Sequence, residues 1–303
     1  MKSKFHAGEI EVQMRARVQD IARRVAGVMR STIPPVAQEF LRDQRMVIVS
    51  TVDSEGRVWA SILTGDPGFM QAVNETTLKI EANPIPGDPL VENLRTGRDI
   101  GILVIELSTR QRMKLKGRSS LGEEGSIYVH AERVYALCPK YIQAREVVGR
   151  VDKTRTEHLI QHAERLDENQ QRWVSLADTF FIASFNPETG ADASHRGGNP
   201  GFVRVLSPNK LVFPDYSGNN MLNTLGNISA NPNVGLLFVD FEHGNTLQIT
   251  GGARIIWDKE RKAEFAGAER LVEFEIERII EIANVISLRW QFLGYSPFNP
   301  GSK

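Results

Sequence analysis

The chain repeats itself, and this internal repeat constrains the fold more than any other feature of the sequence. Residues 48–69 and 181–202 align without a gap at a shift of 133, which places Phe69 on Phe202 and the preceding Gly-Asp-Pro-Gly on Gly-Asn-Pro-Gly. At a shift of 134, Gly101-Ile-Leu-Val-Ile-Glu106 then falls on Gly235-Leu-Leu-Phe-Val-Asp240. A register kept over about 70 residues is difficult to obtain by chance, and we interpret it as a tandem duplication.

Each copy has the same predicted order of elements. An apolar, β-rich run passes through a turn into a second strand, which is typical of a hairpin. A short strand, a helix and two further strands follow, over 77–80, 89–96, 100–107 and 113–121 in the first copy and over 210–213, 220–230, 234–241 and 246–257 in the second. Many short strands with one helix favour a small barrel, because closure leaves no exposed sheet edge. The predicted fold class is therefore mainly β with flanking helices (α+β), built as two tandem barrels.

The segments outside the copies are predicted to be helical. Apolar residues recur at helical spacing over 7–30, Pro34-Pro35 ends that helix, and a short helix is expected over 36–42. Residues 154–177 are polar and are expected to form a mostly helical connector. The predicted division is an N-terminal helical segment, 1–45, a first barrel, 46–150, a connector, 151–177, and a second barrel, 178–303.

Charge and composition exclude several functional classes. Of the 303 residues, 37 are Lys or Arg and 37 are Asp or Glu, and this zero formal net charge argues against nucleic acid or an anionic membrane as the partner. The single cysteine, Cys138, rules out a disulfide within the chain, and the N-terminus lacks the apolar stretch of a secretory leader. No apolar run approaches the roughly 20 residues of a membrane-spanning helix. We expect a cytoplasmic protein with no nucleic-acid or membrane partner.

Common catalytic signatures are absent from the sequence. There is no P-loop, no His-Glu-x-x-His zinc motif, no Cys-x-x-Cys and no Gly-x-Gly-x-x-Gly after a strand. His158 and His162 are four residues apart on the predicted connector helix, but no carboxylate or cysteine cluster supports a metal site there. We therefore assign no metal ligand.

The two copies differ most in one short string. The second copy has Ser194-His-Arg-Gly-Gly198 where the first has Ser61-Ile-Leu-Thr-Gly65. Arg196 offers a fork of N–H donors that suits a phosphate or a ring carbonyl, and Gly197 with its neighbour would let a flat ligand approach the backbone. His195 is a candidate general acid or base, because the ordinary pKa of imidazole lies near neutrality. The alternative is a glycine turn at the surface without a function.

A second polar cluster follows at the start of the predicted helix 220–230. It comprises Asn219, Asn220, Asn223, Thr224 and Asn227. Free backbone N–H groups and the helix dipole favour a phosphate at such a helix start. Asn223 and Asn227 are one turn apart and so share a face, which capping does not require; the alternative is N-capping and turn chemistry by the same asparagines.

Basic residues alternate along one predicted strand of the first copy. They are Arg110, Arg112, Lys114, Lys116 and Arg118. Alternation on a strand places all five on one face. We interpret this face as solvated, with binding of a phosphorylated substrate as the alternative.

Taken together, these strings resemble the pyridoxamine 5′-phosphate oxidase-like family, whose members are split β-barrel flavoproteins. The resemblance lies in Ser-His-Arg-Gly-Gly-Asn-Pro-Gly-Phe-Val-Arg-Val at 194–205, Pro-Asp-Tyr-Ser-Gly-Asn-Asn at 214–220, Asn-Thr-Leu-Gly-Asn at 223–227, and the stretch 231–238. Residues 5–9, 85–89 and 138–143 resemble a subgroup that is often fused to a ferredoxin-reductase-like module. We expect no such module within the 303 residues.

The resemblance implies FMN as the cofactor, bound at the interface between two barrels. Carried over by position, the cofactor-binding residues are Ser194, His195, Arg196, Gly197, Asn219, Asn220, Asn223, Thr224, Asn227, Lys140 and Gln143. Lys140 and Gln143, with Tyr141 between them, would reach the flavin from the first barrel, since sites of this family borrow residues from the partner barrel. For Lys140 the alternative is a solvated lysine.

The resemblance also implies an FMN-dependent oxidoreductase with a small-molecule substrate or an external electron donor. The two copies would reproduce within one chain the interface that single-barrel relatives build as homodimers, and this chain could itself pair into a homodimer. One FMN per chain is expected, because the first copy lacks the His-Arg-Gly-Gly donors. The alternatives are a non-catalytic flavin-binding carrier or sensor, and a barrel that binds haem or another planar ligand.

Overall fold

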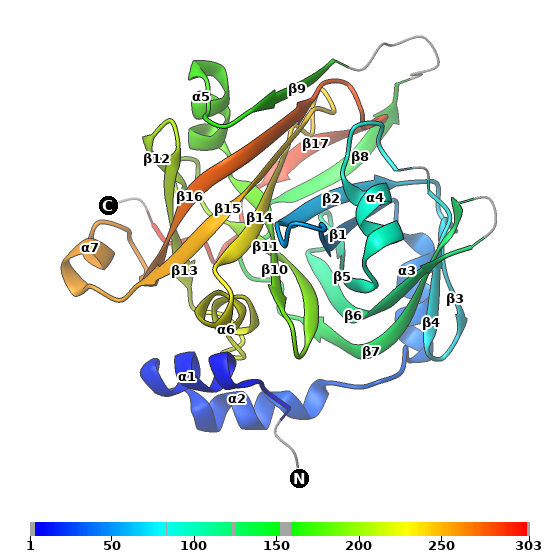
Figure 1. Ribbon diagram of the computed structural model, residues 1–303, viewed down its shortest axis with the longest axis horizontal. Helices are drawn as coiled ribbons and strands as arrows, with labels where there is room; N and C mark the ends of the chain where they lie inside the picture. Colours follow the sequence, from blue (N-terminus) through cyan, green and yellow to red (C-terminus); the bar gives the residue numbers. More distant parts are fainter. Residues whose placement is uncertain (1–3, 83, 123–124, 152–158, 302–303) are drawn as a thin grey trace.

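The computed structural model describes residues 4–82, 84–122, 125–151 and 159–301 of the protein. Two open antiparallel sheets dominate it, and Figure 1 shows them side by side, with the first copy in blue to green and the second in green to orange. The first sheet has the strand order β2-β1-β5-β6-β7-β4-β3, and its strands are β1 (Met46–Val52), β2 (Val58–Thr64), β3 (Met70–Asn74), β4 (Thr77–Ile80), β5 (Asp99–Glu106), β6 (Gln111–Leu121) and β7 (Ile127–Leu137). The second has the order β11-β10-β14-β15-β16-β13-β12, and its strands are β10 (Thr179–Asn186), β11 (Gly190–Gly197), β12 (Arg204–Ser207), β13 (Lys210–Tyr216), β14 (Asn233–Val239), β15 (Thr246–Ile256) and β16 (Ala268–Ile282).

The two sheets share one register, as the repeat predicts. Val49 pairs with Ser61 and Ile102 in the first sheet, while Ile182 pairs with Ser194 and Leu236 at the equivalent positions of the second. A β-bulge interrupts β6 between residues 116 and 117, and another interrupts β15 between residues 250 and 251, again 134 positions apart. The predicted class, mainly β with two tandem split barrels, is confirmed.

The copies pack back to back through their first strands. Ile48 and Leu103 of one copy and Phe181 and Leu237 of the other are fully buried in a common apolar cluster. Gly101 allows close contact, because a Cβ there would lie 2.7 Å from the backbone nitrogen of Asp192. Strands buried on both faces need apolar residues on both, which explains their continuous apolar runs. This packing brings the two sheets together around the site described below.

The N-terminal segment departs from the single helix predicted over 7–30. It forms α1 (Ala7–Arg15), α2 (Gln19–Val25) and a 3-10 turn (Ala26–Val28), followed by α3 (Pro35–Asp43), where a helix was expected. Arg17 breaks the long helix, since its φ of 58° lies in the left-handed region. Helix α1 instead packs against α6 (Asn223–Ala230), and Figure 1 shows it crossing beneath that helix.

The connector is less helical than predicted. Within its described part, β9 (Ile160–Ala163) pairs with β16, and only α5 (Glu168–Leu176), capped by Asp167, is helical. His162 lies on β9, so the helical spacing assumed for a histidine pair does not hold, and His158 lies outside the described residues. Strand β13 pairs with residues 268–275 of β16, so the edge at 279–282 is left for β9, which satisfies its N–H and C=O groups.

Four further elements complete the described structure. Helix α4 (Leu90–Thr96) is the first-copy counterpart of α6, and α7 (Lys259–Ala263) precedes β16. Strands β8 (Ala144–Arg150) and β17 (Leu288–Gly294), which follow the last barrel strand of each copy, pair with each other as a two-stranded ribbon. None of the helices in the described ranges is both long enough and apolar enough to span a membrane.

Candidate functional site

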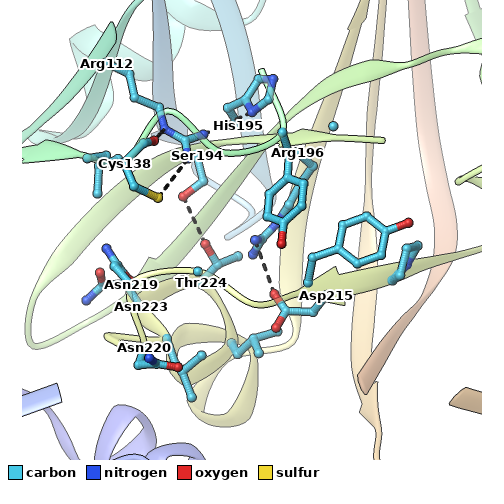
Figure 2. Close-up of a pocket in the computed structure, with 18 of the residues that line it drawn as sticks. Arg112, Cys138, Ser194, His195, Arg196, Asp215, Asn219, Asn220, Asn223 and Thr224 are labelled. Carbon is cyan, nitrogen blue, oxygen red and sulfur yellow. Dashed lines mark hydrogen bonds and ion pairs between the residues drawn. The ribbon is translucent and has the colours of Figure 1, made fainter. Parts of the chain in front are cut away.

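A cleft lies where β6 and the tail of the first copy meet β11, β13 and α6 of the second. Its empty volume is about 860 Å³, measured to its open mouth. Figure 2 shows Arg112 and Cys138 entering from the first copy and Ser194, Thr224 and Asp215 from the second. Of the predicted cofactor-binding residues, eight line this cleft: Ser194, His195, Arg196, Gly197, Asn219, Asn220, Asn223 and Thr224.

The basic stripe of β6 faces the second copy, and the prediction of a solvated face is wrong for its central residues. Lys114 and Lys116 are each only 4% exposed. Lys114 Nζ lies 2.7 Å from the Oδ2 atom of buried Asp192 and also donates to the Ser194 hydroxyl. Burial lowers the pKa of Lys114 to about 8, while the lysine charges hold the pKa of Asp192 below its usual range despite burial. The stripe thus carries positive charge into the interface.

Arg112, next along the stripe, fixes the protonation state of His195. Its Nη1 atom lies 3.0 Å from His195 Nδ1, and because a guanidinium can only donate, Nδ1 must accept. The imidazole is then neutral, with its proton on Nε2, which has no hydrogen-bond partner among the described residues. Burial and the charges of Arg112 and Arg196 hold the pKa of His195 well below its usual range. His195 is therefore a neutral hydrogen-bond donor near neutral pH, which disfavours the predicted role of general base.

Arg196 reaches the other wall of the cleft. Its Nη1 atom lies 3.2 Å from Asp215 Oδ1, and Asp215 also accepts from Arg270 at 2.8 Å. The Arg196 Nε atom is buried and has no partner within the described ranges. An unpartnered buried donor beside a cleft is a place where a ligand oxygen would be stabilised.

The loop before α6 is strained, and the helix starts later than predicted. Asn220 and Leu222 have φ values of 61° and 58°, which an α-helix excludes, so α6 begins only at Asn223. The Asn219 side chain accepts from the Met221 backbone N–H at 3.0 Å, which stabilises this turn. Tyr141, across the cleft, also has a positive φ, of 66°. Strained residues of this kind cluster at ligand sites, where the surrounding structure holds them in place.

Asn223 and Thr224 line the cleft in different ways. The Thr224 hydroxyl is hydrogen-bonded to the Ser194 hydroxyl at 3.1 Å, beside Lys114. Both polar atoms of the Asn223 side chain already have partners within the protein: the amide nitrogen donates to Glu9 of α1, and the oxygen accepts from the Tyr135 hydroxyl. Thr224, with the first backbone N–H groups of α6, is thus better placed than the Asn223 side chain to hold a phosphate.

Three predicted cofactor-binding residues do not line the cleft. Asn227 is fully buried, with its side-chain oxygen hydrogen-bonded to His6 and its amide nitrogen donating to the Ser184 hydroxyl. Gln143 is also fully buried, and its side chain binds backbone and side-chain groups around it, among them the Ser296 N–H. Lys140 lies with its ammonium 5.8 Å from the centre of the Phe298 ring. The family resemblance predicted their proximity to the site, but tertiary neighbours contact their polar groups.

The structure requires a glycine at position 197 for a reason that differs from the predicted one. A Cβ at this position would lie 2.1 Å from the Tyr141 carbonyl oxygen, so the glycine admits the first-copy tail. The same tail brings the Tyr141 ring to 5.1 Å from the Tyr216 ring, and the Tyr141 hydroxyl donates to the Ser217 carbonyl at 2.9 Å. The glycine therefore makes room for a wall of the cleft rather than for a flat ligand.

Sequence reasoning missed several residues that line the cleft. They are Arg112 and Lys114, considered only as a stripe, with Asp215, Tyr216 and Cys138. The available signal was alternation itself: Arg112, Lys114 and Lys116 alternate along β6 in the copy that lacks the His-Arg-Gly-Gly string, and they complement that string in the other copy.

Fold and cleft together define a tandem split-barrel protein with a cationic site between its barrels. Residues 166–286, which include most of the second barrel, match the family model "Pyridoxamine 5′-phosphate oxidase". The predicted resemblance is thereby confirmed. None of the curated proteins compared with the chain matches it.

Solved structures with a similar fold are distant in sequence. HupZ of Group A Streptococcus is 12% identical, with a TM-score of 0.32, and the match covers 40% of this chain and 98% of that one. An FMN-binding protein from Syntrophomonas wolfei is 8% identical, with a TM-score of 0.29, over 37% of this chain and 84% of that one. General Stress Protein 26 of Bacillus anthracis is 13% identical, with a TM-score of 0.29, over 40% and 93%. Each of these matches covers less than half of this chain.

Proposed function

We propose that the protein is an FMN-dependent oxidoreductase that binds one FMN in the cleft between its barrels. The observation that carries this proposal is the convergence of Arg112 and Lys114 from one barrel with Ser194 and Arg196 from the other on a single open cleft. The family model that the second barrel matches is named for a phosphate-bearing substrate, and a cationic cleft suits the phosphate of such a ligand.

The donor set fits FMN at both ends. Lys114, the Ser194 and Thr224 hydroxyls and the first turn of α6 would hold the phosphate, since an ammonium, hydroxyls and helix N–H groups are its usual partners. Arg196 Nε, buried and unpartnered within the described residues, and the Nε2–H of His195 would serve acceptor atoms of the ring. Tyr141 and Tyr216 provide an apolar wall. FMN, when bound, supplies the electron or hydride transfer, and the chain's residues orient it and set its electrostatic surroundings.

The first experiment is the absorbance spectrum of the purified protein, with and without FMN, for the wild type and for Arg196→Ala. Flavin bands near roughly 370 and 450 nm are expected in the wild type. Affinity should fall about 10- to 100-fold in the variant, which loses a charged donor. Arg204→Ala is the control, because Arg204 is surface-exposed, pairs with Glu264 and does not line the cleft. A wild type that ignores FMN would overturn the proposal, and haem bands would favour the planar-ligand alternative.

The same titration gives the stoichiometry. One FMN per chain is expected, because the equivalent positions of Arg112 and Lys114 in the second copy are Thr246 and Gln248. Two FMN per chain would contradict this assignment. Reduction of the bound flavin by screened hydride donors then separates an oxidoreductase from a flavin carrier, which would bind FMN without being reduced.

A further inference from the structure

Arg112 differs from the other cations of the cleft in having only neutral partners. Its Nε atom donates to the Cys138 carbonyl at 3.0 Å, Nη2 to the Lys140 carbonyl at 3.3 Å, and Nη1 to His195 Nδ1 at 3.0 Å. Among the ion pairs of the described residues, none includes Arg112. The guanidinium is thus held firmly in the wall of the cleft, with its charge uncompensated by a carboxylate.

The carboxylates nearest the cleft are already paired. Asp192 is bound by Lys114, and Asp215 is shared by Arg196 and Arg270. An arginine stays charged even where it is partly removed from water, and such a charge without a counter-ion raises the free energy of the site. A negative charge on a bound ligand could therefore pair with Arg112 without displacing a carboxylate of the protein.

Arg112 lies apart from the residues to which we assign the phosphate. Arg112 lies two residues before Lys114 on the same face of β6, about 7 Å away along the strand. Lys114 is the residue that contacts Ser194, whose hydroxyl meets Thr224. If the phosphate lies among these three, Arg112 is left for the part of the ligand beyond it.

We propose that Arg112 stabilises negative charge that the flavin ring gains on reduction, and so raises the reduction potential of the bound FMN. The inference rests on the proposed function. An oxidised, neutral ring that takes two electrons from a reductant and one proton from solvent carries one negative charge. Arg112 then binds the reduced form more tightly than the oxidised form, and by thermodynamic linkage this difference in affinity is a shift in potential. The barrel copy that lacks the His-Arg-Gly-Gly string would thereby set the redox chemistry of the other.

The test compares the wild type with Arg112→Met, which removes the charge, and Arg112→Lys, which keeps it. FMN affinity is measured by flavin fluorescence, and the midpoint potential by dithionite titration against a reference dye. We expect Arg112→Met to weaken binding of reduced FMN about tenfold more than that of oxidised FMN, equivalent to a potential about 30 mV more negative. Arg112→Lys should keep most of the wild-type potential. Arg118→Met, on the same strand but at the surface in a pair with Asp99, is the matched control.

The outcomes separate the two proposals. If the wild type binds no FMN, the proposed function fails and this inference with it. If the wild type binds FMN but Arg112→Met has an unchanged potential, or weakens both redox forms equally, Arg112 is only an anchor and the inference is overturned. Should Arg112→Met fail to fold, Arg112→Gln, which keeps hydrogen-bonding capacity without the charge, replaces it in the same titration.

Discussion

The two barrels meet twice, through equivalent sets of strands; an open cleft lies at one meeting place, and buried side chains fill the described part of the other. At the cleft, β6 of the first copy contributes Arg112, Lys114 and Lys116; at the equivalent place, β15 of the second contributes Thr246, Gln248 and Thr250. The sequences of the other copy at the two places differ in the same way: Ser-His-Arg at 194–196 lies at the cleft, and Ser-Ile-Leu at 61–63 lies at the equivalent place. One backbone arrangement thus supports a cationic site and a filled counterpart whose equivalent strand positions carry no basic residue.

The filled counterpart contains an anion of the protein's own. Asp88 is buried there, and its carboxylate accepts from the Ser61 hydroxyl at 2.6 Å, the Leu90 N–H at 2.8 Å and the Gln248 amide at 3.0 Å. At the open cleft, the positions equivalent to these donors are Ser194, Thr224 and Lys114, and the position of Asp88 is taken by Leu222. The comparison therefore indicates where a ligand phosphate would lie, since the same three positions already surround a carboxylate in the other copy.

The largest expected effect is that of Lys114→Met. Among the described residues, this change leaves Lys116, 4.0 Å away, as the remaining ion-pair partner of the buried Asp192 carboxylate, and it should lower the free energy of unfolding by about 3 kcal/mol. The equivalent Gln248→Met removes hydrogen bonds, one of them to the Asp88 carboxylate, but no formal charge, and should lower it by about 1–2 kcal/mol. Urea denaturation of both variants measures the difference. Equal losses of unfolding free energy in the two variants would mean that the lysine charge does not distinguish the open interface from the filled one.

Asp88→Asn should stabilise the protein in a pH-dependent manner. Burial raises the pKa of Asp88 to about 6, above its ordinary 3.8, so its carboxyl favours the folded state below about pH 4 and this stability is lost as pH rises through 6. The amide removes the titration and should raise the free energy of unfolding by about 2 kcal/mol near pH 8, with no gain near pH 4. The exposed Asp43→Asn is the control. A gain that does not depend on pH would contradict the buried-charge explanation.

The smallest expected effect concerns two equivalent asparagines. Asn93 donates to Thr51 at 3.0 Å, and Asn227 donates to Ser184 at 2.9 Å but also bonds to His6 at 2.9 Å. Asn227→Ala should therefore cost about 1 kcal/mol more than Asn93→Ala in thermal or urea unfolding, the value of one further hydrogen bond. The opposite order would show that α1 adds nothing to the anchoring of α6.

The repeat predicted the strands well because register and side-chain alternation are local properties. Strand β4 matches its predicted bounds, and α3 lies within a residue of them at each end. The inward direction of Lys114 and Lys116 was not predictable in the same way, since alternation defines a strand face but not what covers it. Asn227 failed as a site residue for a related reason: its partners His6 and Ser184 lie far from it in sequence.

The two barrels are parts of one polypeptide, in which β8 and β17 also pair as a ribbon, and this covalent linkage has an evolutionary consequence. In a symmetric homodimer every substitution appears at both interfaces, so a lysine placed at one must also be placed at the other. Here Lys114 and Gln248 are encoded separately, and each interface can change alone. Covalent joining also keeps the barrels together at any dilution, because their association is intramolecular. The duplication thus gives this protein a freedom that two identical subunits lack: one interface can serve chemistry while the other serves only cohesion.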